Sequence, residues 1–525
     1  MSGPRPLPSR PSLRYLQLEA KRRLAAGEFA ALHDAQAAIA REHGLPSWAA
    51  LKQRIGDPQE SHALAGLKWV ISRFAEAGTP GWIAPGEEEL SEHFAPVFLA
   101  AVPADRLVEG IIRLASDLRG ELTVVRSNAL EAQVELAGIQ CLAAAEAALP
   151  HRLAGLRLLP LGGRIRDPRA TPPPPTRFLG EPPPEVAAIA EQSFAELGLA
   201  ALLLAGGGAS GAGAESAHSA DSADSAGSID GAGAAWALAF GWADLDRAQP
   251  LDPGHRFPAT GVSALVTATA VLRLVADGRF GLDSRANDHL RAVRLADDTI
   301  TVADLLSHTA GVDNPAAADM YADEVPELAA LMGPVIGCNG PREVPRPSNG
   351  GYAVLGQLIA DVTGMPFPDA AARLVLDPLS LRDSSFPARV ADIGPGAVTG
   401  YAVNTNGMFV PIPARIPAIP AAGGLWSTGA DLVRLGLRWS SLLPGSLAHE
   451  ALTARTEPLP GGRRFGLGWL VSPRGDTALH AGATPDATSS LHVRTSGKRT
   501  HVVLTSRLIP LTTVDDRLLR SWTNP

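Results

Sequence analysis

Lysine is the residue that most limits the chemistry open to this chain. Its only lysines are Lys21, Lys52, Lys68 and Lys498, so residues 69–497 contain none. A serine nucleophile needs a neighbouring base, and in one group of serine enzymes that base is a lysine one helical turn away. Such a serine–lysine pair is therefore excluded over most of the sequence.

The thirteen histidines are the other possible bases. A serine presented on a G-x-S-x-G turn would suit a Ser–His–Asp triad, but the nearest match, residues 261–265 (GVSAL), lacks the closing glycine. His308 and His480 are the histidines most expected beside a pocket. A core hydrogen bond is favoured for His308, and pocket lining without catalysis is favoured for His480, because no nucleophile is found to partner it.

Cysteine usage and net charge exclude further classes. Cys141 and Cys338 are the only cysteines. Their separation excludes a disulfide framework and a cysteine-based zinc site, and it suits a reducing compartment. The formal net charge is −8, with no basic stripe, which argues against a nucleic-acid partner. We expect no cofactor and no metal, since the acidic and histidine side chains of residues 218–224 occur in a run that favours a solvated loop.

Helix and strand signals surround these candidates from residue 187 onward. The apolar run after Thr260 predicts a helix that ends at Gly278. DLLSHTAGV, PSNGGYAVLG, GGLWSTGADL, FGLGW and HAGATPDATSSLHVR follow, before a final strand, THVVLTS. In this order, over residues 187–525, the series resembles the serine β-lactamase and DD-peptidase superfamily in its class C and esterase-like branch, which includes penicillin-binding proteins. The resemblance implies an α+β fold, with an antiparallel sheet flanked by helices and joined to an all-helical subdomain.

The same resemblance implies three catalytic elements, which can be placed on this sequence residue by residue. The superfamily's Ser-x-x-Lys element aligns with Gly261 and Ala264. Its Tyr-x-Asn element aligns with Pro347 and Asn349, and its Lys/His-x-Gly element with His480-Ala481-Gly482. The nucleophile, base and tyrosine positions are therefore all replaced, and we expect no catalytic residue.

What remains predicts a ligand pocket without catalysis. We expect it to be lined by Gly261, Ala264, Pro347, Asn349, His480, Gly482 and Ala483. The backbone N–H groups of Gly261 and Ala483 would form an anion site, and the missing side chain at 261 would widen the floor of the cleft. Small acidic amides or esters should then bind reversibly, more tightly below about pH 6.5, where a histidine such as His480 is ordinarily protonated.

Two alternatives stay open. The protein could be a working esterase, amidase or β-lactamase-like hydrolase that uses Ser263, Ser348 or His480, although Ser263 lies about 200° around the helix from position 261 and is expected to face the helix packing. Alternatively, the N-terminal segments could carry the function as interaction modules, with a protein partner bound by the N-terminal cap.

Two segments precede the large region. Residues 1–60 predict a short helical cap. Residues 61–160 predict a small α+β domain in which helices are followed by hairpin strands. This domain resembles the steroid-isomerase-like domain that precedes some β-lactamase-like proteins, including one of the clavulanic-acid cluster. The paired acidic groups of the isomerase have no counterpart here, so a structural role is favoured.

Two biased stretches separate or interrupt these domains. Residues 161–186 contain many prolines and predict an extended linker between the small domain and a domain at 187–525. Residues 206–234 are rich in glycine, alanine and serine and predict a disordered insertion between two strands. The N-terminus lacks the apolar segment of a secretory signal and no run is long enough to span a bilayer, so a cytoplasmic protein without membrane contact is expected.

Overall fold

The computed structural model describes most of the chain from residue 61 onward and short pieces before it. The described residues are 19–20, 22–24, 28–29, 31–42, 48, 61–112 (without 78, 80 and 103), 122–160 (without 128–129, 137–138 and 147–149), 167, 175–208 (without 179) and 235–521 (without 316–318, 341, 343–344, 405–406, 460–461, 497–498 and 510–511). They form two compact units, Met1–Pro160 and Leu161–Pro525. This division falls at the predicted end of the small domain.

The first unit contains helices followed by a meander of strands, in the predicted order. Its helices are α2 (Leu32–Glu42), α4 (His62–Phe74), α5 (Glu87–His93), α6 (Pro96–Ala101) and α7 (Ala104–Ile112). Its strands are β1 (Leu122–Ser127), β2 (Glu131–Leu136), β3 (Ile139–Ala145) and β4 (Leu153–Pro160). Helix α2 lies within residues 1–60, where a helical cap is predicted. The described residues are too few to test the rest of the cap.

The four strands form an antiparallel sheet in sequence order, and α4 packs on it. Ser61 caps the start of α4 by accepting a hydrogen bond from the Leu64 N–H. Leu64, Leu67 and Phe74 of α4 then pack in one core with Val134 of the sheet, and all four are almost fully buried. The small α+β domain therefore has a hydrophobic core of its own.

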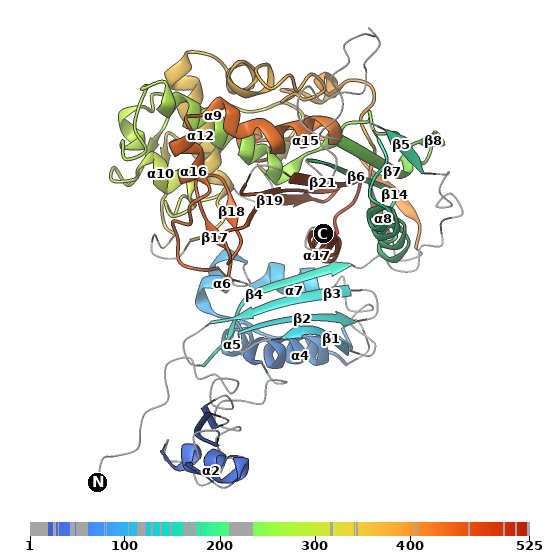
Figure 1. The fold of residues 1–525 in the computed structure, drawn as a ribbon, viewed down its shortest axis with the longest axis vertical. Coiled ribbons are helices and arrows are strands. Elements are labelled where there is room, and N and C mark those ends of the chain that lie inside the picture. The colour runs from blue at the N-terminus through green and yellow to red at the C-terminus, as the bar shows by residue number, and fades with distance from the viewer. Residues whose placement is uncertain are drawn as a thin grey trace. The chain divides into compact units, whose positions relative to one another are not determined.

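The second unit is larger and combines a sheet with many helices (Figure 1). The strands of its main sheet are β5 (Thr176–Phe178), β6 (Ala201–Gly208), β7 (Ala235–Asp244), β8 (Gln249–Pro250), β17 (Arg464–Phe465), β18 (Leu470–Val471), β19 (Thr477–Thr484), β20 (Ala487–Arg494) and β21 (Arg499–Thr505). Its longer helices are α8 (Pro184–Leu197), α9 (Ser263–Ala276), α12 (Asn349–Thr363), α15 (Gly429–Arg438), α16 (Gly445–Ala451) and α17 (Thr512–Ser521).

Shorter elements complete this unit. They are β9 (Phe257–Pro258), the 3₁₀ helix η3 (Thr260–Val262), β10 (Arg294–Leu295), α10 (Val302–Leu306), β11 (Tyr321–Ala322), α11 (Leu328–Met332), β12 (Val335–Ile336), α13 (Phe367–Ala371), β13 (Gly400–Val403), β14 (Phe409–Ile412), β15 (Ile416–Pro417), α14 (Pro420–Gly423) and β16 (Trp426–Ser427). Further single turns of 3₁₀ or π helix connect them.

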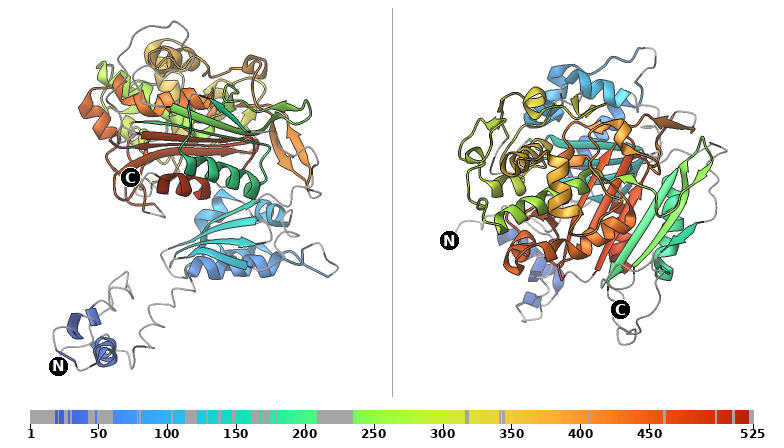
Figure 2. Two further views of the ribbon diagram at one scale, coloured as in Figure 1. Left: turned by 45° about the vertical axis from the view of Figure 1, so that its right-hand side comes forward. Right: turned by 90° about the horizontal axis from the view of Figure 1, so that it is seen from above.

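The main sheet is antiparallel, in the order β17-β18-β19-β20-β21-β6-β7-β5, with β8 paired to β7. Helices cover both of its faces (Figure 2). Helix α15 packs on β6, β20 and β21, and the side chains of Leu203 and Ala205 belong to the core on that side. Leu202 and Leu204 point to the other face, where they pack with residues of α8 and α17. This confirms the predicted antiparallel sheet flanked by helices.

The structure corrects the limits of the predicted linker and insertion. Strand β5 and the start of α8 both lie within 161–186. Proline is tolerated in the first turn of a helix, where its missing N–H is not needed, so α8 can begin at Pro184 despite the prolines around it. Most of the remaining residues of 161–186 lie outside the described part of the chain.

Residues 206–208, predicted as the start of the insertion, belong to strand β6. Their glycines leave room for neighbouring side chains. A Cβ atom on Gly206 would lie 2.4 Å from the indole ring of Trp236, and one on Gly207 would lie 3.1 Å from Val433 of α15. Residues 209–234 lie outside the described residues. The strands on either side, β6 and β7, pair as predicted.

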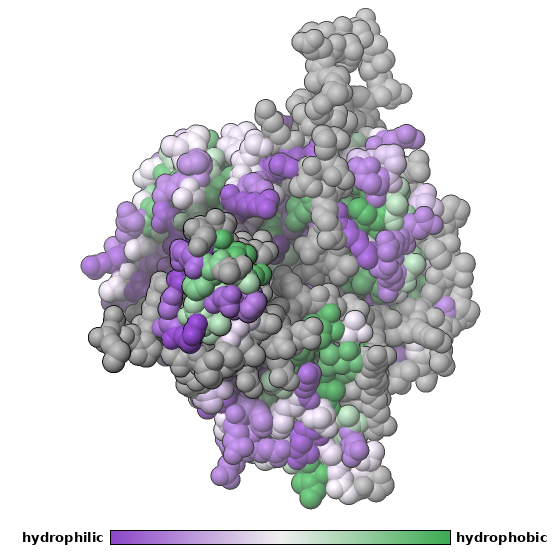
Figure 3. Space-filling model, turned by 60° about the horizontal axis from the view of Figure 1, so that its bottom comes forward, coloured by the Kyte–Doolittle hydropathy of each residue, from purple (hydrophilic) through white to green (hydrophobic). Residues whose placement is uncertain are grey.

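No helix in the described parts of the chain is long and apolar enough to cross a membrane. On the face drawn in Figure 3, hydrophobic residues occur in small groups among hydrophilic ones.

Candidate functional site

The position of the superfamily nucleophile lies in a tight turn at the start of the central helix. Gly261 is the middle residue of η3, which leads directly into α9. Thr260, just before it, has a φ of +41°, which is strained for a β-branched residue. Ala264, at the position of the base, is only 3% exposed. The predicted base position therefore contributes only a buried methyl group.

Strand β19 occupies the space that a side chain at 261 would need. A Cβ atom on Gly261 would lie 2.5 Å from the Ala481 carbonyl oxygen and 3.0 Å from the Gly482 Cα. A Cβ atom on Gly482 would in turn lie 2.1 Å from the Gly261 nitrogen. The two backbones are in direct contact because both residues are glycine. The prediction that the missing side chain widens the floor of the cleft is therefore wrong.

Ser263, the alternative nucleophile, is fully buried and fully hydrogen-bonded. Its hydroxyl donates to the Thr260 carbonyl at 2.6 Å and accepts from the Leu425 N–H at 3.0 Å. The hydroxyl therefore ties η3 to the segment before β16. This confirms the expectation that Ser263 faces the helix packing.

The second superfamily element lies at the start of α12. Pro347 and Asn349 are exposed, while Ser348 between them is buried. The Ser348 hydroxyl caps α12 by accepting from the Gly351 N–H and donating to the Val312 carbonyl. Ser348 is thus a structural residue, although it was one of the possible unorthodox nucleophiles.

His308 connects the second element to the third. Its Nδ1 accepts a hydrogen bond from the Ser348 N–H at 3.0 Å, as its predicted structural role requires. Burial and the nearby His480 lower the pKa of His308 to about 3. The ring packs beside Tyr352 and Phe465, with centroid distances of 5.0 and 4.6 Å. His308 is therefore a neutral core residue at physiological pH.

The third element lies on β19. Gly482 is half-buried and Ala483 is exposed, whereas the Nδ1 of His480 is buried and has no hydrogen-bond partner among the described residues. Burial lowers the pKa of His480 to about 4, although the backbone of Ala481 opposes this shift. The expectation that His480 becomes charged near pH 6.5 is therefore wrong, because the buried ring gains its proton only at much lower pH.

The fold thus brings the three elements together: Gly261 touches β19, His480 neighbours His308, and His308 binds the residue before Asn349. The sequence analysis did not predict one residue that contacts the first element, Ser489 on β20. Its hydroxyl lies 2.5 Å from the Thr260 hydroxyl and donates to the Ala259 carbonyl at 2.6 Å. A buried hydroxyl pair between segments 229 residues apart leaves no mark on local sequence patterns.

Sequence reasoning also missed a polar cavity of about 410 Å³ beside these elements. It is lined by Thr309, Arg342, Pro345, Ala454, Arg455, Thr456, Glu457 and Arg464. Thr309 follows His308 along the chain, and Pro345 comes shortly before Pro347. Three arginines and one glutamate thus line this cavity.

The fold and the three elements define the architecture of penicillin-binding and class C serine hydrolases. The beta-lactamase family model matches residues 222–521, and the chain belongs to this family. Solved structures show the same fold. The octameric penicillin-binding protein homologue from Pyrococcus abyssi has a TM-score of 0.52 and 19% identity, covering 64% of this chain and 76% of its own. A D-amino acid amidase from Ochrobactrum anthropi has a TM-score of 0.51 and 20% identity, covering 65% of this chain and 98% of its own.

Among curated proteins, penicillin-binding protein 4 of Amycolatopsis lactamdurans is 33% identical over 138 residues, which are 24% of this chain and 35% of that protein. The protein flp of Staphylococcus aureus is 25% identical over 158 residues, which are 28% of this chain and 31% of that protein. The chain thus spans about a third of the length of these relatives.

Proposed function

We propose that this chain is a non-catalytic member of the beta-lactamase family, whose large unit binds ligands or regulates instead of hydrolysing. One observation carries the proposal: the backbone of β19 fills the place where the nucleophile side chain would stand. A serine hydrolase that loses its nucleophile or base loses on the order of six decades in turnover. Here the nucleophile and base positions are Gly261 and Ala264, and no lysine occurs between residues 69 and 497.

The rival proposal, an active hydrolase with unorthodox residues, has little support from the geometry. The hydroxyls of Ser263 and Ser348 each both donate and accept a hydrogen bond inside the fold. A nucleophilic serine needs a base within hydrogen-bond reach of its hydroxyl. Among the described residues, the partners of both hydroxyls are backbone groups, which cannot serve as that base.

Covalent labelling tests this proposal. The full chain is incubated with a fluorophosphonate and, separately, with a fluorescent penicillin, and intact mass is measured beside a known serine hydrolase as the reagent control. We expect no adduct. Stoichiometric labelling would overturn the proposal, and the variants Ser263→Ala and Ser348→Ala would show whether either serine is the modified residue.

We further infer that the ligands are small acidic molecules and that the arginine-lined cavity holds them. Arg342 is engaged by Asp304 at 2.9 Å and by Asp297 at 3.3 Å, and Arg455 pairs with Glu450. Arg464 is exposed and has no ion pair among the described residues. A guanidinium without a carboxylate partner can bind a ligand carboxylate through two parallel hydrogen bonds. Arg464 therefore replaces His480 as the proposed anion-binding side chain.

Calorimetric titration with N-acyl amino acids, compared with their methyl esters, tests this inference. Binding should need the free carboxylate, should weaken with added salt, and should fall at least tenfold in Arg464→Gln. Arg474→Gln is the matched control, because Arg474 is an exposed arginine of the same unit that does not line this cavity. Equal binding by acid and ester, or equal loss in both variants, would contradict the inference.

A further inference from the structure

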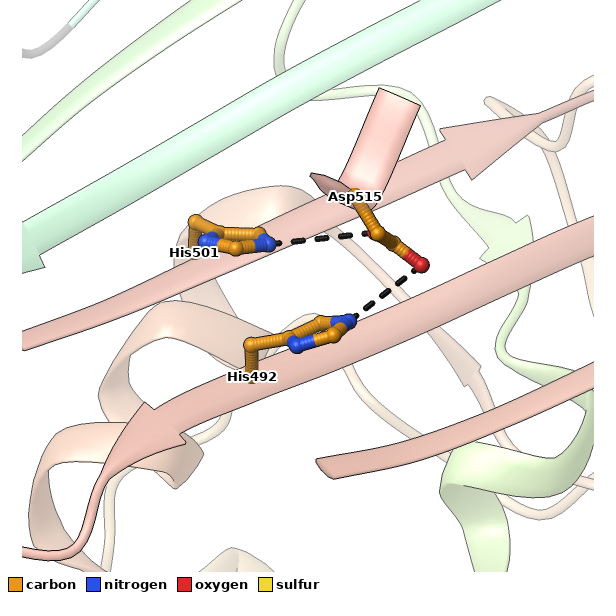
Figure 4. Close-up of side chains that lie close together, drawn as sticks. All are labelled: His492, His501 and Asp515. Atoms are coloured by element: carbon orange, nitrogen blue, oxygen red, sulfur yellow. Dashed lines mark ion pairs between the residues drawn. The ribbon is translucent and has the colours of Figure 1, made fainter. Parts of the chain in front are cut away.

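Two histidines and an aspartate lie close together on the face of the main sheet that α8 and α17 cover (Figure 4). His492 on β20 and His501 on β21 are direct partners in the strand register. Their rings stack with a centroid distance of 4.5 Å and an interplanar angle of 19°. Asp515 reaches them from α17, with 3.2 Å between its Oδ2 and the Nε2 of His492 and 3.8 Å between its Oδ1 and the Nε2 of His501.

This cluster is buried in an apolar layer. His492 and His501 are each 1% exposed and Asp515 is 7% exposed. Hydrophobic residues of α8, β6, β21 and α17 form a core cluster on the same face of the sheet. Ionisable groups are rarely placed in such a layer unless they are paired or bind a metal, because removing a charge from water is unfavourable.

Within this cluster, the described partners do not fully satisfy His492. Asp515 has the two histidines and the Ser490 hydroxyl, which donates to its Oδ1 at 2.7 Å, and within the described residues it has no arginine or lysine partner. Neither ring nitrogen of His492 makes a well-aligned hydrogen bond with a described residue. A fully buried imidazole that points at a carboxylate without a well-aligned hydrogen bond is in a suitable position to bind a cation.

The geometry points to a binding site for a divalent transition-metal ion, zinc foremost, formed by His492, His501 and Asp515. Their donor atoms all lie within 4.8 Å of one another. Zinc is bound by histidine nitrogens at about 2.0–2.1 Å and carboxylate oxygens at about 2.0–2.2 Å, which places the ligand atoms roughly 3.4 Å apart. The His492–Asp515 distance already fits, and the remaining ligands need to approach by about 1 Å.

The surroundings of the carboxylate and the donor set agree with a metal site. The hydrogen bond from Ser490 orients the carboxylate, as groups behind metal ligands commonly do. Two histidines and one carboxylate are a donor set for zinc and other divalent first-row metals, whereas calcium and magnesium prefer oxygen ligands only.

The site is separate from the superfamily site. In the register of β19 and β20, His492 lies opposite Leu479, and His480 lies opposite Leu491. Cross-strand partners share a face and neighbours along a strand alternate, so His492 and His480 point to opposite faces of the sheet. A metal here would fasten α17 to the sheet, where Arg517 of α17 already pairs with Glu196 of α8 at 2.9 Å. We therefore assign it a structural role, independent of the proposed function.

Metal analysis of the full chain tests the assignment. The protein is expressed in zinc-supplemented and in cobalt-supplemented medium, purified through a tag without histidine, and dialysed against a weak chelator. We expect about one metal ion per chain and, with cobalt, the visible d–d bands of a tetrahedral nitrogen–oxygen site. Removing the metal with a strong chelator in dilute urea should lower the melting temperature by about 5 °C, and returning zinc should restore it.

Three variants make this test specific. His492→Gln and Asp515→Asn keep the volume of each side chain, and both should lose the bound metal and the zinc-dependent rise in melting temperature. His480→Gln is the control, because it removes a buried histidine from the opposite face of the same sheet and should keep both. Absence of bound metal in the wild type, or equal metal content in all four proteins, would overturn the assignment.

Discussion

At the scale of single residues, the contact between Gly261 and Gly482 is the observation on which the proposed loss of catalysis rests. We expect Gly261→Ser to destabilise the protein without restoring hydrolysis. The new Cβ atom would lie 2.5 Å from the Ala481 carbonyl oxygen, so β19 or η3 must move. Such overpacking typically costs about 1–3 kcal/mol of the free energy of unfolding, which urea denaturation would measure.

The matched control is Gly445→Ser. Gly445 begins α16, its φ is not positive, and a Cβ atom there would meet nothing within 4 Å. This variant should unfold within about 0.5 kcal/mol of the wild type. If Gly261→Ser were as stable as this control and turned over nitrocefin or a nitrophenyl ester, both the closed site and the proposed loss of catalysis would be wrong.

Buried histidines also predict how stability depends on pH. The pKa values of His308 and His480 in the folded state, about 3 and about 4, lie below the ordinary histidine value. Between about pH 4 and pH 6.5 the unfolded chain therefore binds more protons than the folded one, and the free energy of unfolding should fall as pH falls through this window. It should level off above about pH 7.5, where both states hold neutral histidines.

Urea unfolding of metal-free protein at pH 7.5, 6.5, 5.5 and 4.5 would measure this dependence. His480→Gln should show a shallower slope below about pH 6.5, because one of the histidines with a lowered pKa is gone. An exposed histidine provides the control, and His449→Gln should leave the slope unchanged. An unchanged slope in His480→Gln would show that His480 is not buried in the neutral form.

The sequence could align residues with the three elements of the superfamily, but it could not predict how closely they pack. The motif order predicts that Gly261, Asn349 and His480 lie near one another, and the structure places Gly261 against β19 and Ser348, next to Asn349, against His308. The closure of the site depends on two glycines that are 221 positions apart meeting backbone to backbone, and no local pattern records this. The pKa of His480 depends on burial in the same way, which is why the expected pH range was too high.

At the scale of elements, glycines bring α15 close to the main sheet. A Cβ atom on Gly436 would lie 2.4 Å from the Thr500 hydroxyl of β21, and one on Gly429 would lie 2.4 Å from Leu203 of β6. Gly436→Ala should therefore destabilise the protein by about 1–3 kcal/mol, although alanine inside a helix is normally favoured over glycine by about 1 kcal/mol.

Thermal and urea unfolding would check this sign reversal. Gly445→Ala, at the open start of α16, should be neutral or slightly stabilising. If Gly436→Ala were more stable than the wild type, α15 could not lie as close to β21 as the structure has it. Such a result would also argue against the register in which β6, β21 and β20 pair beneath α15.

Elements were predicted well where periodicity is strong and poorly where tertiary packing overrides composition. The hydrophobic spacing of α4 and α9 indicated both helices. Strand β5 follows Pro175 in a proline-rich stretch, and its pairing with β7 is what makes it a strand. The glycines that end β6 were predicted to belong to the disordered insertion for a similar reason. They leave space for Trp236 and Val433, and these neighbours lie far along the chain.

At the scale of the whole molecule, the composition of residues 161–174 and 209–234 predicts the first sites of proteolysis. Neither stretch carries enough apolar residues to offset the entropy of ordering it. Trypsin should therefore cut first at Arg164 or Arg169, rather than at Arg166 beside the buried Asp167, and a glutamate-specific protease should cut at Glu215. Trypsin has no site in 209–234, which contains neither arginine nor lysine, so the two enzymes test the two stretches separately.

The two cuts should have different consequences. Cleavage at Arg164 or Arg169 should divide the chain into one fragment that holds the first unit, with its own core, and one that holds the second. Cleavage at Glu215 should leave its two fragments associated on gel filtration, because β6 stays paired with both β7 and β21 in the main sheet. N-terminal sequencing and intact mass would identify the cuts. Early cleavage within α9, or dissociation after cleavage at Glu215, would contradict the sheet order in which β6 joins the two halves of the large unit.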